Sequence, residues 1–172
     1  MSVYDRSAYA SARKYRELRR KDLRDGALAG LLAGAAVMLL FLAYDLVSFT
    51  PLATPEFLSA ALFGSGNASP AEEAGSDGGR LALFTVVHLA TFVLLGIGLA
   101  RLFRNTGVRR SLWAGGLYGF LVCTIIFSVS MQITGTEVSD GPGHWAIMAV
   151  NLAAGLVMVS YLRVAQGSRV SL

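Results

Sequence analysis

Four long apolar runs, separated by polar connections, dominate the pattern of hydrophobic and polar positions along the chain. The runs are Ala27–Tyr44, Leu81–Ala100, Ser111–Thr134 and Trp145–Leu162. An α-helix rises about 1.5 Å per residue, so about 20 apolar residues cross a hydrocarbon layer about 30 Å thick. The pattern therefore predicts an all-α integral membrane protein. Its four transmembrane helices are expected at about 26–49, 81–103, 110–134 and 144–163.

The basic residues lie almost entirely on one side of these spans. Of 15 Lys and Arg residues, eight precede the first span, four lie at the second connection and two follow the last span. Only Arg80 falls on the other side. Because basic residues collect on the cytoplasmic side of membrane proteins, we expect both termini in the cytoplasm. The long loop 50–80 and the short loop 135–143 are then expected outside.

The chain leaves no room for a separate soluble domain of ordinary size. We expect a basic cytoplasmic amphipathic helix over 1–25, a four-helix bundle over 26–165, a flexible outer linker over 64–79 and a cytoplasmic tail over 166–172. Basic side chains beside a span attract anionic lipid headgroups by about 1 kcal/mol each. The residues expected to contact headgroups of the cytoplasmic leaflet are Arg13, Lys14, Arg16, Arg19, Arg20, Lys21 and Arg24. Trp113, Trp145 and Tyr161 are expected to anchor the span ends at the interfaces.

A short apolar helix is predicted in the outer loop, over about 55–63. Thr54 is expected as its N-cap, Pro55 as its first residue and Gly64 as its end. Because this helix is too short to span the membrane, we expect it to lie in the outer interface or to cap the bundle.

Glycines recur at intervals of four residues on two spans. They are Gly26, Gly30 and Gly34 on the first span, and Gly115 and Gly119 on the third. Such stripes let helix backbones approach closely in lipid. They favour packing within the bundle, with docking to another membrane protein as the alternative.

Four polar side chains, each from a different span, are expected in the outer half of the membrane. They are Asp45, His88, Gln132 and Asn151. A buried carboxyl group needs a partner, and His88 is the predicted partner of Asp45. The cluster has two interpretations: a proton-linked or ligand-binding site, or interhelical hydrogen bonds worth about 0.6 kcal/mol each.

His88 is the candidate cofactor-binding residue of the spans. Haem b needs axial ligands, usually His, and the two His residues of the chain, His88 and His144, are expected at different depths. A quinone needs no motif, because an apolar groove is enough to contact it. We therefore predict no cofactor and no metal site. The remaining options are haem b at His88, or contact of a quinone or carotenoid with an apolar groove. The single cysteine, Cys123, is expected to be a small core residue.

A pattern of residues in the first half of the chain resembles the pattern of a group of known proteins. It consists of Asp45, the run Pro51-Leu52-Ala53-Thr54-Pro55, the run Ala61-Leu62-Phe63-Gly64, Thr85 and His88. It is similar to small four-span membrane proteins of bacteria, to which no activity is assigned. The resemblance covers mainly residues 26–100. It implies the same topology and a bacterial cytoplasmic membrane location, and it implies no mechanism.

The residue pattern carries no signature of an enzyme, such as a phosphate-binding loop or a nucleophile with its base. The basic residues follow the spans, so no nucleic acid partner is expected. Our leading hypothesis is a non-catalytic accessory subunit of a larger membrane complex, respiratory or photosynthetic, with lipids and other integral membrane proteins as partners. The alternatives are a small proton-linked transporter or channel using Asp45 and His88, and a haem- or quinone-binding redox protein.

Overall fold

Every element that the structure describes is helical. The computed structural model describes residues 3–48, 50–64, 78–106, 111–134 and 144–167. Its elements are α1 (Val3–Val47), α2 (Ala53–Phe63), α4 (Gly78–Thr106), α5 (Leu112–Tyr118), the π-helix η1 (Gly119–Cys123), α6 (Thr124–Thr134) and α7 (His144–Gly167). Most of the predicted linker 64–79, all of the loop 135–143 and the tail beyond Gly167 lie outside the described residues.

Four helical segments are long and apolar enough to cross a membrane. They are Tyr15–Val47, Gly78–Arg104, Leu112–Ser130 and Trp145–Ala165. This confirms the predicted all-helical fold with four candidate transmembrane spans.

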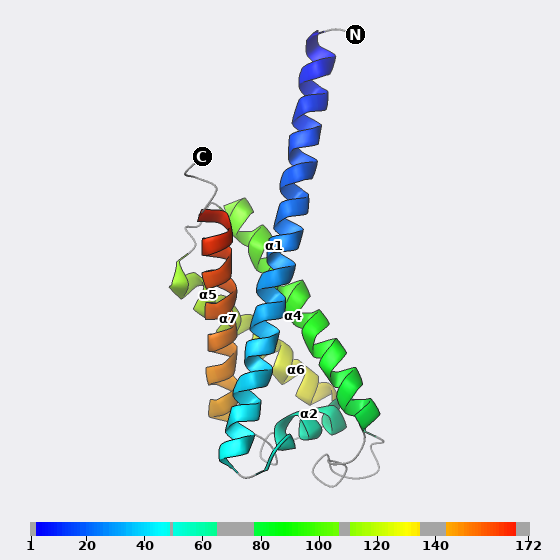
Figure 1. Cartoon of the computed structure of the whole chain (residues 1–172), viewed down its shortest axis with the longest axis vertical. Helices are drawn as coiled ribbons and strands as arrows, with labels where there is room; N and C mark the ends of the chain where they lie inside the picture. The colour runs from blue at the N-terminus through cyan, green and yellow to red at the C-terminus, as the bar shows by residue number, and fades with distance from the viewer. Residues whose placement is uncertain (1–2, 49, 65–77, 107–110, 135–143, 168–172) are drawn as a thin grey trace.

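The first span and the predicted N-terminal helix form one continuous helix. α1 is 45 residues long, or roughly 65 Å at about 1.5 Å per residue, and its N-terminal part extends in line beyond the other helices (Figure 1). Asp22 accepts a hydrogen bond from Arg104 of α4 at 2.5 Å, which ties α1 to α4 where the extension begins. The chain does not bend at Gly26, so the helix expected over 1–25 and the first span are a single element.

α1 and α4 touch backbone to backbone. A Cβ atom on Gly30 would overlap the carbonyl group of Phe92, and one on Gly96 would overlap the Gly26 carbonyl oxygen. The contact at Gly34 is less close, because a Cβ atom there would meet only the side chains of Leu89 and Phe92. The predicted glycine stripe of the first span therefore lies inside the bundle, against α4.

The third span packs on α7 in the same way. A Cβ atom on Gly119 would overlap the backbone of Gly155, and one on Gly115 would overlap the side chain of Val159. The second predicted stripe is thus also an internal contact. After this contact the span departs from the expected uninterrupted helix: η1 adds a π-helical stretch, and α6 leaves α7 and reaches α2.

α2 lies across the end of the bundle opposite the two chain termini, here called the α2 end (Figure 1). The main buried cluster joins α1, α4 and α7 and includes Ala33, Leu99 and Met158. A second buried cluster joins α2 to α4 through Phe57, Leu58, Ala61 and Phe84.

Replacing Gly96 by Ala tests the backbone contact between α1 and α4. We expect the Gly96→Ala protein to lose about 1–3 kcal/mol of stability, because the backbone atoms that the new methyl group meets cannot move aside. Gly98→Ala is the matched control two residues away: its Cβ would meet only the Tyr118 hydroxyl, at 3.1 Å. That variant should stay within about 1 kcal/mol of the parent. Thermal unfolding of the solubilised proteins measures both, and equal stability of the two variants would contradict the contact.

Candidate functional site

Asp45 anchors α2 to the end of α1. Its side chain is only 1% exposed. One carboxyl oxygen accepts a hydrogen bond from the backbone N–H of Thr54 at 2.9 Å, and the other accepts one from the Thr54 hydroxyl at 2.5 Å. The carboxyl group is therefore satisfied by the first turn of α2. This corrects the predicted pairing of Asp45 with His88.

A tight turn brings Thr54 to Asp45. The Ala53 N–H donates to the Thr50 carbonyl at 3.1 Å, and Leu52 has φ 68° and ψ 5°. With Pro51 before it, this is type II turn geometry, in which a left-handed residue is usually Gly. Leu52 is the N-cap of α2, so the predicted N-cap, Thr54, is instead the second residue of the helix. Gly64 ends the helix as predicted, and its N–H donates to the Ala60 carbonyl at 2.7 Å.

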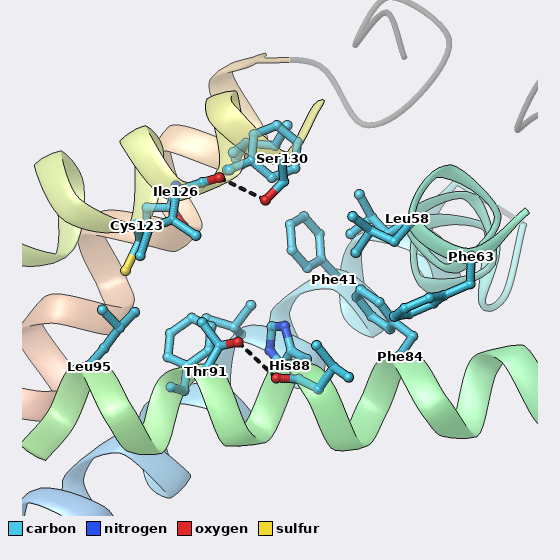
Figure 2. A pocket seen from close by; sticks show the side chains of 17 residues that line it. Phe41, Leu58, Phe63, Phe84, His88, Thr91, Leu95, Cys123, Ile126 and Ser130 are labelled. Carbon is cyan, nitrogen blue, oxygen red and sulfur yellow. Dashed lines mark hydrogen bonds between the residues drawn. The ribbon is translucent and has the colours of Figure 1, made fainter. Parts of the chain in front are cut away.

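A cavity of about 300 Å³ lies behind α2, between α1, α4, α6 and α7. Most of its lining is apolar and much of it is aromatic; the phenylalanines are Phe41, Phe63, Phe84, Phe92 and Phe127. Figure 2 shows α4 on one side of the cavity, α6 on the other and α2 at its end.

His88 lies in the wall of the cavity that α4 forms. Its ring is flanked by two phenylalanines of the same helix, with centroid distances of 5.6 Å to Phe84 and 4.7 Å to Phe92. Its Nε2 atom lies 3.4 Å from the Gly34 carbonyl oxygen of α1. No described residue hydrogen-bonds the other ring nitrogen.

Four further residues with polar atoms line the cavity: Thr91, Cys123, Ser130 and Asn151. The Thr91 hydroxyl donates to the Val87 carbonyl at 2.9 Å. The Asn151 amide donates to the Thr124 hydroxyl at 3.1 Å, which links α7 to α6.

The structure brings together only part of the predicted polar cluster. His88 and Asn151 line the same cavity. Asp45 lies outside this lining and binds Thr54, and Gln132 is exposed. Trp113 and Trp145 both project from the bundle, whereas Tyr161 packs on the main core.

α4 and α6 both border the cavity. These helices have few direct contacts with each other. Val87 of α4 and Ile126 of α6 both line the cavity and are 41% and 38% exposed, which indicates an opening between the two helices. A smaller cavity of about 220 Å³ lies between α1, α2 and α4, and Phe41, Leu58, Phe84 and His88 border both cavities.

Within the described residues, no group of three or more His, Cys, Asp or Glu side chains could hold a metal ion. The Nε2 atom of His88 already faces a backbone carbonyl, so a haem iron on that nitrogen would require the ring to turn. The side chain of His144 lies outside the described set.

No protein-family model, curated protein or solved structure matches the chain. The site therefore has to be argued from its own residues. Sequence reasoning missed the aromatic lining, although Phe84, His88 and Phe92 recur at intervals of four residues and so share one helix face.

Removing the Asp45 carboxyl group should loosen α2. We expect Asp45→Ala to destabilise this helix by about 2 kcal/mol and Thr54→Val, which loses only the hydroxyl bond, by about 1 kcal/mol. Hydrogen exchange of the α2 amides, followed by mass spectrometry, measures the change. Thr50→Val, at an exposed position of the same turn, is the control and should exchange like the parent. Unchanged α2 exchange in Asp45→Ala would refute the anchor.

Proposed function

We propose that the protein binds a membrane-soluble small molecule of the quinone class, with a ring-shaped polar head and a hydrocarbon tail. The observation that carries this proposal is the aromatic cavity among the candidate spans, with His88 and Thr91 in its lining. Ligand sites are mostly apolar concavities in which a few converging polar groups orient the ligand.

The shape of the cavity suits the head of such a ligand. A volume of about 300 Å³ lies at the lower end of the range for small-molecule pockets. It suits a substituted ring and leaves a long tail outside. Five phenylalanines and His88 supply flat faces and edges against which a ring packs favourably, by about 0.5–1.5 kcal/mol for each good aromatic pair.

The opening between α4 and α6 supplies the route for the tail. Its edges carry Val87 and Ile126, apolar residues that are partly exposed. In a membrane this side of the bundle would face lipid, so a ligand could enter directly from the bilayer. The distribution of basic residues would place the α2 end, and hence the cavity, in the outer half of the membrane.

Two observations favour ligand binding over the other hypotheses. The glycine stripes, which could have docked a partner, are occupied inside the bundle. The Asp45 carboxyl group, which a proton pathway would need, is held by Thr54. The proposed role is binding, without catalysis by the protein itself.

A second candidate function is an accessory subunit of a larger membrane complex. It is favoured by the extension of α1 beyond the bundle (Figure 1), where Arg13, Arg16, Arg19, Arg20 and Lys21 are exposed. Such a basic helix would suit an acidic surface of a partner subunit on the cytoplasmic side.

Narrowing the side opening should reduce binding of a tailed quinone. We expect the parent protein in lipid nanodiscs to bind decylubiquinone, and Ile126→Trp to weaken binding by about tenfold, or 1.4 kcal/mol. Ile125→Trp is the matched control, because Ile125 is 58% exposed and does not line the cavity. Native mass spectrometry, with empty nanodiscs as the blank, measures the bound quinone. Equal effects of the two tryptophans, or no binding by the parent, would count against the proposal.

Charge reversal tests the accessory role separately. If the α1 extension docks a partner, Arg19→Glu/Arg20→Glu should release the protein from any complex with which it co-purifies. Arg101→Glu/Arg163→Glu, also at exposed positions, should leave it attached. Gentle solubilisation, affinity capture and mass spectrometry compare the two double variants, and retention of the same partners by both would dismiss docking through α1.

A further inference from the structure

The direction of the hydrogen bonds in the cavity wall determines whether a ligand must donate or accept a hydrogen bond there. The Thr91 hydroxyl donates to the Val87 carbonyl, and the Ser130 hydroxyl donates to the Ile126 carbonyl, each at 2.9 Å (Figure 2). Both hydroxyl protons are therefore used within their own helices. A hydroxyl that has donated its proton can still accept, through its oxygen lone pairs. Thr91 thus presents an acceptor to the cavity, on the wall that α4 forms.

His88, like Thr91, presents a hydrogen-bond acceptor to the cavity. A carbonyl oxygen can only accept, so the contact of 3.4 Å between Nε2 and the Gly34 carbonyl favours the tautomer that carries its proton on Nε2. In that neutral tautomer the other nitrogen, Nδ1, carries a lone pair and is an acceptor. Asn151 retains one N–H and its carbonyl oxygen, so it can pair with either a donor or an acceptor on a ligand.

From this arrangement we infer that the cavity selects a head group that donates a hydrogen bond, so that it binds the hydroquinone form in preference to the quinone. This inference rests on the proposed function and specifies its ligand. A hydroquinone hydroxyl can donate to His88 Nδ1 or to the Thr91 oxygen. At His88 and Thr91 a quinone carbonyl would face lone pairs, and the donors left in the lining are one N–H of Asn151 and the weak S–H donor of Cys123. A buried polar group that faces lone pairs without a donor is costly. Sites built for one hydrogen-bonding polarity reject the opposite polarity strongly.

The two redox forms of one quinone are a nearly ideal pair of probes, because they share the ring and the tail and differ in hydrogen-bonding polarity. We expect decylubiquinol, kept under anaerobic conditions, to bind the protein in nanodiscs at least about tenfold more tightly than decylubiquinone. His88→Phe keeps a ring at this position but removes both nitrogens, and it should reduce the preference to about twofold or less.

Thr91→Val gives a second, gentler variant. It keeps the shape of the side chain and removes the hydroxyl, and we expect it to weaken decylubiquinol binding several-fold while leaving decylubiquinone unchanged. Thr85→Val is the matched control: Thr85 lies on the same helix and its hydroxyl makes the same kind of bond, to the Leu81 carbonyl at 2.9 Å. Thr85 is not among the residues that line the cavity. Its replacement should change neither affinity.

The outcomes separate this inference from the proposed function. Equal binding of both forms, or tighter binding of the quinone, overturns the selection and leaves quinone binding standing. Binding of neither form overturns the proposed function itself. Farnesol and its methyl ether, tested in parallel, identify the source of the hydroxyl. Tight binding of farnesol alone supports selection of a donor but assigns it to an isoprenoid alcohol instead of a hydroquinone.

Discussion

Backbone contact at glycine is the constraint on which the rest of this structure depends. Lipid gives helices no hydrophobic reason to associate, so they join where their backbones can come close. Gly26, Gly30 and Gly96 hold α1 against α4, and Gly119 and Gly155 hold the third span against α7. Because α1 and α4 cross closely near these glycines, they spread apart toward the α2 end (Figure 1). α6 leaves α7 in the same direction. The spread creates the space that α2 and the cavity share.

α2 partly fills this space, and a buried carboxyl group holds it in place. An isolated carboxyl group among candidate spans would be costly, but Asp45 has two donors from Thr54. The other free amides at the start of α2 also have partners, since Ala53 donates to Thr50 and Glu56 to Leu52, and Pro55 has no N–H. The most buried acid of the spans therefore serves the architecture. What remains for a ligand is the less polar space behind α2, bordered by His88.

Hydropathy was enough to predict the four spans, and the glycine spacing was enough to predict the packing faces, because both depend on the period of a single helix. The pairing of Asp45 with His88 could not be predicted correctly, because depth along a helix says nothing about the direction in which a side chain points around it. The start of α2 was misplaced because Leu52 takes a left-handed conformation that its residue type does not announce. The cavity escaped prediction for a related reason: it results from the angles at which helices cross, which no local pattern of residues encodes.

The polar groups near the cavity differ in how many of their hydrogen-bonding atoms have partners. Asp45 and Thr54 satisfy each other, and the hydroxyls of Thr91 and Ser130 donate to their own helices. His88 is satisfied on one side only, through Gly34. In a medium of low dielectric constant a polar atom without a hydrogen-bond partner is costly. The imidazole of His88 would therefore gain from a new partner. Under the proposed function, the stability of the α2 end and the recognition of the ligand would therefore depend on different residues. Asp45 holds α2 in place through Thr54, and the proposed ligand would contact His88 without breaking these bonds.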